Sequence, residues 1–109
     1  MIARIWHGFT STENASTYEN MLRKDVLPGI GKVKGYKGAQ LMRGNLQHET
    51  EFITITYFDD INAVIAFAGE NYTKAVIDKE AGKLLTHYDE RSVHYELVEM
   101  IMPGGFMQF

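Results

Sequence analysis

The sequence predicts a small α+β domain in which helices cover one face of a four-stranded antiparallel sheet. Three observations lead to this prediction. The length of 109 residues fits one domain and leaves no room for two. Segments with strand and helix patterns follow in the order strand, helix, strand, strand, helix, strand. The third strand-like segment is semi-apolar on both faces, which indicates a sheet covered on both sides.

The first strand and helix are marked by residue type and spacing. β-branched and aromatic residues predict a strand over Ile2–Phe9. The Ser11-Thr12 pair then offers side chains suited to a helix N-cap. Apolar residues at helical spacing predict an amphipathic helix over residues 13–27, and we expect the Pro28-Gly29 pair to end it.

The middle of the chain reads as a loop followed by a hairpin. Residues 29–38 contain four glycines and three lysines, which predicts a loop. Strands are predicted over Tyr36–Arg43 and Glu51–Phe58. Gly44-Asn45 between them is a turn signal, so the two strands should pair as a hairpin.

The second half of the chain again predicts helical segments followed by a strand. We expect Asp59-Asp60 to cap a helix over Ile61–Ala68, and Asn71 to begin a second short helical segment that Gly82 ends. The last strand is predicted over Arg91–Met100. The resulting order, βαββαβ, is the ferredoxin-like pattern.

Residues 1–99 are therefore predicted to form the domain, and residues 100–109 an apolar tail. Phe106, Met107 and Phe109 are too apolar for a free end, so we expect them to dock or to be partly ordered by contacts. The helices of this fold cover one sheet face only, and the other face is also apolar. A second copy of the chain is the simplest cover, which predicts a homodimer.

Composition excludes several classes of function. A net charge of −3 gives no basic footprint for nucleic acid. The absence of cysteine excludes disulfides, thiolate metal sites and a cysteine nucleophile. No stretch approaches the roughly 18–20 apolar residues of a membrane span, and the apolar run at the N-terminus is too short for a signal peptide. We therefore expect a cytoplasmic protein with no nucleic-acid or membrane partner.

Three segments resemble one family. The stretches Ile2–Gly8 (IARIWHG), Ala63–Glu70 (AVIAFAGE) and Val93–Val98 (VHYELV) look like the antibiotic biosynthesis monooxygenase superfamily, and in particular its small bacterial members without an assigned activity. The resemblance covers roughly residues 1–99. It implies a dimeric α/β barrel, in which two sheets pack face to face and each subunit has a cavity between its sheet and its helices.

The resemblance also implies a chemistry. Characterised relatives include cofactor-free oxygenases of aromatic substrates, quinol monooxygenases and haem-degrading enzymes. The haem-degrading relatives use Asn, Trp and an axial His at positions that here hold His7, Phe67 and Ile77, so haem degradation is disfavoured. The expectation is a cofactor-independent monooxygenase acting on a small aromatic or quinol-like molecule. The alternative is a non-catalytic dimeric protein that binds a small ligand or serves as an accessory protein.

His7 is the candidate catalytic residue. It shares a strand face with Ala3, Ile5 and Phe9, and comparison with the family directs that face toward the cavity. A neutral imidazole there could take a proton from a phenolic substrate. A structural histidine bonded to a backbone or tyrosine oxygen is the competing interpretation.

Aromatic residues are the candidate walls and contacts. The predicted substrate-binding residues are Tyr57, Phe67, Tyr72 and Tyr95. Trp6 and His94 are predicted to face the dimer partner, because neighbours in a strand point to opposite sides. Packing is the competing interpretation for all of them. The spacing of the four histidines matches no metal-ligand motif, so no metal site is expected; His48 and His87 complete the set.

Overall fold

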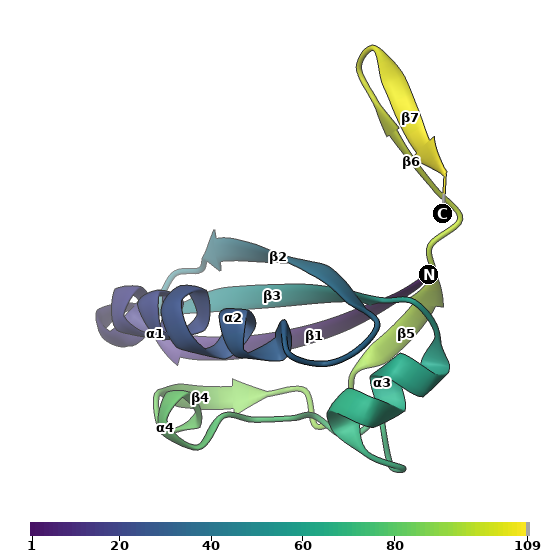
Figure 1. The fold of residues 1–109 in the computed structure, drawn as a ribbon. Helices are drawn as coiled ribbons and strands as arrows, with labels where there is room; N and C mark the ends of the chain where they lie inside the picture. Colours follow the sequence, from purple (N-terminus) through teal and green to yellow (C-terminus); the bar gives the residue numbers. More distant parts are fainter. Residues whose placement is uncertain (109) are drawn as a thin grey trace.

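The computed structural model describes the backbone of residues 1–108 and the side chains of residues 1–104. β1 (Ile2–Ser11) runs through the middle of an antiparallel sheet. β3 (Glu49–Phe58) pairs with β1 along its whole length, from Ile2 opposite Phe58 to Ser11 opposite Glu49. β2 (Tyr36–Asn45) pairs with β3 and forms one edge of the sheet (Figure 1).

The other side of β1 is occupied by two short strands. β4 (Leu85–Tyr88) pairs with its C-terminal half, and β5 (Val93–Glu96) pairs with its N-terminal half. The order is thus β2-β3-β1, followed by β4 and β5 together. This antiparallel arrangement is consistent with the predicted ferredoxin-like order. The predicted single strand over Arg91–Met100 is wrong, because β5 ends at Glu96 and its role is shared with β4.

The first helical segment is longer than predicted. Ser11 caps it as expected, since its Oγ accepts a hydrogen bond from the Asn14 N–H. A 3₁₀ turn (η1, Thr12–Asn14), α1 (Ala15–Met21), a π turn (η2, Leu22–Val26) and α2 (Leu27–Ile30) follow without a break. Pro28 does not end the helix. It lies in the first turn of α2, directly after the π turn, in which the Leu27 N–H bonds to the Leu22 carbonyl.

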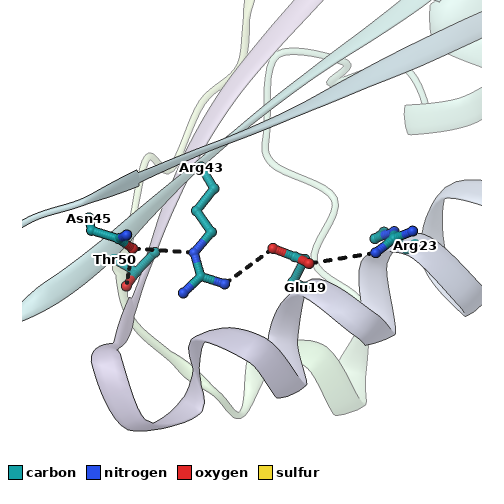
Figure 2. A network of polar contacts seen from close by, with 5 residues as sticks. All are labelled: Glu19, Arg23, Arg43, Asn45 and Thr50. Carbon is teal, nitrogen blue, oxygen red and sulfur yellow. Dashed lines mark hydrogen bonds and ion pairs between the residues drawn. The ribbon is translucent and has the colours of Figure 1, made fainter.

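This segment packs on the sheet through an aromatic pair. The Tyr18 and Phe52 rings meet edge to face with centroids 5.1 Å apart, and both side chains are buried. A polar network at the surface holds α1 over β2: Glu19 accepts from Arg43 and also pairs with Arg23 (Figure 2). The remaining members of the network are Asn45 and Thr50.

α3 (Ile61–Ala68) has the predicted bounds and caps. The Asp60 carboxylate accepts from the Ala63 N–H at 2.9 Å, and Gly69 ends the helix at a φ of 89°. Its buried face, Ala63 and Val64, packs on Phe58 of β3.

The predicted second helix is largely wrong. Residues 71–78 are irregular, and only α4 (Lys79–Gly82) is helical, with Asp78 as its N-cap. The reason is tertiary. The backbone of this segment bonds to other parts of the chain: Ala75 N–H to the Glu90 carbonyl, and Ser92 N–H to the Thr73 carbonyl. These bonds replace the i→i−4 bonds of a helix.

The C-terminal residues form a separate hairpin. β6 (Glu99–Met102) pairs with β7 (Gly105–Gln108), and the hairpin projects away from the rest of the molecule (Figure 1). Phe109 and the side chains of Phe106 and Met107 lie outside what the structure describes, so the docking of the tail stays a prediction.

The sheet face opposite the helices is rich in apolar residues, as predicted. Met42 of β2 and Val93 and Tyr95 of β5 lie on it and are 45%, 50% and 56% exposed. Among the described residues, none of the helices combines the length and apolar character that crossing a membrane requires.

Candidate functional site

A cavity of about 360 Å³ lies between the sheet and the helical layer. Strands β1 and β3 form its floor, residues 18–33 and Phe67 of α3 form much of its wall, and residues 76–82 close another part. Most of its lining is apolar. The polar or charged side chains at the wall are Arg4, Tyr18, Asp25, Thr54, Thr56, Asp78 and Ser92.

The register of β1 against β3 decides which residues reach this cavity. Gly8 lies opposite Phe52 and Ile2 opposite Phe58. Because both phenylalanines pack against the helices, the even-numbered residues of β1 face the helical layer. Arg4 and Trp6 therefore line the cavity.

His7 consequently points to the opposite, open face of the sheet. The prediction that it faces the cavity is wrong, and so is the assignment of Ala3, Ile5 and Phe9 to the cavity side. The Nδ1 atom of His7 lies 2.8 Å from a carboxylate oxygen of Glu51 on the neighbouring strand. The sequence could not settle the face, since both faces of β1 carry apolar and polar residues.

Arg4 is the most unusual group at the cavity wall. It is 4% exposed, yet it forms no ion pair with any described residue. Its guanidinium donates to the backbone carbonyls of Tyr72 and Lys74 and to the imidazole of His94. Burial lowers the pKa of Arg4 to about 10, which still leaves it charged at neutral pH.

Trp6 is fixed beside Arg4. Its Nε1–H donates to the Asp89 carbonyl at 2.7 Å, and its six-membered ring lies over Gly8, where a Cβ would come within 2.5 Å of it. The prediction that Trp6 faces a partner is therefore wrong: it faces the helical layer and forms part of the cavity.

His94 lies on the same face, opposite Arg4 across the β1–β5 pair. Its ring meets Tyr72 edge to face at 5.2 Å, and its Nε2 lies 3.0 Å from Nη1 of Arg4. Burial, and then the charge of Arg4, lower the pKa of His94. The prediction that His94 faces the partner is wrong, because His94, like Trp6, faces the helical layer.

The four predicted binding residues divide between the faces. Phe67 lines the cavity. Tyr72 packs against the same buried cluster as Phe67, the one that contains Phe58, and the Tyr72 carbonyl accepts a hydrogen bond from Arg4. Tyr57 and Tyr95 lie on the open face, so their placement in the cavity is wrong. The Tyr57 hydroxyl donates to the side-chain oxygen of Gln40 there.

Two cavity residues were missed by sequence reasoning. Tyr18 is buried beside Asp78, and burial followed by the charge of Asp78 raises the pKa of Tyr18 well above its usual range. Arg4 was missed as well. Its signal was present as a single arginine inside an apolar strand, a position where a charge has to find buried partners.

The histidines of the open face pair with carboxylates and do not gather. His7 contacts Glu51, and His87 contacts Glu49 at 3.0 Å while stacking on Phe9. Among the described residues, no group of three or more histidine and acidic side chains is arranged to hold a metal ion.

The chain is a small α+β domain with a partly open, largely apolar cavity between its sheet and its helical layer. No protein-family model matches the chain, and no curated protein matches its sequence. The family resemblance therefore stays an inference from the three segments described above.

Proposed function

We propose that the protein binds a small aromatic or quinol-like molecule in the cavity and oxygenates it without a cofactor. The observation that supports this proposal is the cavity itself. Its volume of about 360 Å³ falls within the roughly 300–1,000 Å³ of small-molecule sites, and its aromatic walls, Trp6 and Phe67, suit a flat ring. The reaction is the one that the family resemblance implies.

In such a reaction the substrate supplies all the electrons. A methylene carbon activated by a neighbouring aromatic carbonyl loses a proton, and the resulting anion passes one electron to oxygen. Recombination forms a peroxide at that carbon, and loss of water leaves a ketone, so one oxygen atom enters the product and the other leaves as water. The protein's part is to hold the ring, to stabilise the anion and to exclude bulk water.

The alternative function is binding without turnover. One observation favours it: among the described residues, the cavity wall carries no histidine, and His7, the expected base, lies on the other face. A non-catalytic protein would bind the same class of ligand through the same walls and leave it unchanged.

Oxygen uptake separates the two functions. The full chain is incubated with a panel of quinols and anthrones, while dissolved oxygen and the ketone product are followed. The proposal predicts that the chain takes up oxygen with such a substrate. Phe67→Ala should lower the rate and His7→Ala should leave it unchanged, because Phe67 lines the cavity and His7 does not. Saturable binding without oxygen uptake would support the alternative. Absence of any binding would contradict both functions.

We propose further that two copies pair through the open sheet face. Ile5, Ile53 and Ile55 lie on this face in addition to Met42, Val93 and Tyr95, and no helix of the described residues covers it (Figure 1). A monomer rarely leaves a sheet face of this kind in water. A second copy would bring the same face against it about a twofold axis.

The projecting hairpin gives independent support for the pairing. An isolated two-stranded hairpin is marginally stable at best in water. This one has strands of four residues each, and its Ile101 is 74% exposed, as is the preceding Val98 at 75%. We propose that it packs on the second copy, since it extends away from its own domain (Figure 1).

Sedimentation tests the pairing directly. The chain should sediment at twice its mass of 12.4 kDa at micromolar concentration. Ile55→Glu, on the open face, should give monomers. Leu46→Glu is the matched control, because Leu46 is an exposed apolar residue in the turn between β2 and β3, outside this face. A wild-type monomer would overturn the pairing without affecting the cavity.

A further inference from the structure

We infer that the cavity selects aromatic anions and that the Arg4 guanidinium holds the anionic oxygen. This inference rests on the proposed function, because it takes the cavity to be the ligand site. It goes further by naming the charge of the ligand and the group that recognises it. The chemistry is that of a flat ring bearing a carboxylate or an ionised hydroxyl.

The burial of an unpaired cation is the first argument. Moving a charge out of water is costly unless an opposite charge or several hydrogen bonds replace the water. Arg4 is buried, and its described partners are two backbone carbonyls and a neutral imidazole. A negative ligand oxygen would supply the missing counter-charge.

The count of donors is the second argument. A guanidinium has five N–H groups. Both N–H groups of Nη1 are used, on Tyr72 and His94, and one on Nη2 is used, on Lys74. The Nε–H and the second Nη2–H have no acceptor among the described residues. Two free guanidinium donors match the two oxygens of a carboxylate or the single oxygen of a phenolate.

The neighbours of Arg4 explain why the ligand should also be aromatic. The guanidinium carbon lies 5.6 Å from the centre of the Phe67 ring, and both residues line the cavity. A ring that lies against Phe67 and Trp6 is therefore close to the charge. The acidic residues at the wall, Asp25 and Asp78, lie beyond ion-pair distance of Arg4, so neither neutralises it at close range.

The charge of Arg4 also bears on the proposed reaction. A cation at the wall favours the ionised form of a phenol or of an activated methylene group. The ligand can then lose its proton to solvent as it binds. This would make a histidine base at the cavity wall unnecessary, which agrees with the position of His7 on the other face.

Two isosteric probes test the inference on the full chain. 2-Naphthoate and 2-naphthamide have the same ring and nearly the same shape, but only the first carries a charge. Calorimetry should show that the naphthoate binds about tenfold or more tightly, as expected for hydrogen bonds to a charged group. Ionised 4-nitrophenol, followed by its visible absorption, tests the phenolate class in the same way.

Variants identify the group responsible. Arg4→Gln should abolish the preference for naphthoate, and Arg4→Lys should keep part of it. Arg43→Gln is the matched control. Arg43 is also a cation over a phenylalanine, 5.7 Å from the Phe52 ring, but it does not line the cavity and should not affect the preference.

The outcomes are distinguishable. Equal binding of the two naphthalenes by the wild-type chain would overturn the inference and leave the cavity proposal standing. Binding of neither would overturn both. Because the comparison of probes uses the wild-type chain, it decides the question even if an Arg4 variant fails to fold.

Discussion

The Nη1 atom of Arg4 donates a hydrogen bond to Nε2 of His94 over 3.0 Å. A guanidinium can only donate, so Nε2 has to be unprotonated and the single ring proton lies on Nδ1. Burial and the neighbouring charge both lower the pKa of His94. The pair thus joins a permanent cation to a histidine that the fold keeps neutral.

The neutrality of His94 makes stability dependent on pH. In the unfolded chain a histidine titrates at about 6.5, and in the folded protein His94 titrates lower. Between the two values the unfolded state binds a proton that the folded state excludes. The free energy of unfolding should therefore fall as the pH drops below about 6.5, and level off below the folded pKa. His94→Gln should show a weaker fall in urea denaturation, because an amide oxygen can accept from Arg4 without titrating.

The control for this prediction is His48→Gln. His48 is exposed in the turn between β2 and β3, and the substitution should leave the pH dependence as it is in the wild type. If the free energy of unfolding of His94→Gln falls with pH as steeply as that of the wild type, other groups cause the acid sensitivity.

Gly8 should tolerate no larger side chain. A Cβ at Gly8 would come within 2.5 Å of the Trp6 ring and 3.1 Å of Leu85, while the Trp6 indole is held by Asp89. We expect Gly8→Ala to cost about 1–3 kcal/mol of stability, the usual range for overpacking. The fluorescence of Trp6, the single tryptophan of the chain, should shift at the same time.

Gly44→Ala provides the comparison for Gly8. Gly44 lies in β2 of the same sheet, and a Cβ there would meet no atom within 4 Å. The substitution should not lower the denaturation midpoint, and it should leave the emission of Trp6 unchanged. Equal effects at the two positions would contradict the proposed contact with the indole.

Asp60 should contribute more to the stability of the fold than Asp59. Its carboxylate accepts from the Ala63 N–H and begins α3, whereas Asp59 forms an exposed ion pair with Lys37 at 3.5 Å. Asp60→Ala should cost about 0.5–2 kcal/mol, as for other N-caps. Asp59→Ala should cost less than about 1 kcal/mol. Chemical denaturation of the two single variants checks this order, and a larger loss for Asp59→Ala would contradict it.

Features with strong local signals were predictable. The bounds of α3 follow from an aspartate N-cap and a glycine that ends the helix, both of which act within a few residues. The hairpin of β2 and β3 follows from two β-rich segments joined by a short turn. The apolar character of both sheet faces could also be read from the alternation in β3.

The backbone of residues 71–78 depended on tertiary contacts. Local spacing favoured a helix there, but the carbonyls of Tyr72 and Lys74 are bound by Arg4, some 70 residues earlier in the chain. Such long-range bonds leave no trace in a local pattern, so helix propensity was overridden.

By itself, the sequence determined the order of the elements as far as α3 and their bounds to within about three residues, because caps, turns and periodicity act over a few residues. Only the tertiary structure decided which face of β1 lines the cavity. The alternation of side chains along a strand places Trp6 and His7 on opposite faces, but it does not say which of the two faces the helices. The helices and the pairing with Phe52 and Phe58 make that choice, and they place Arg4 and Trp6 inside and His7 outside.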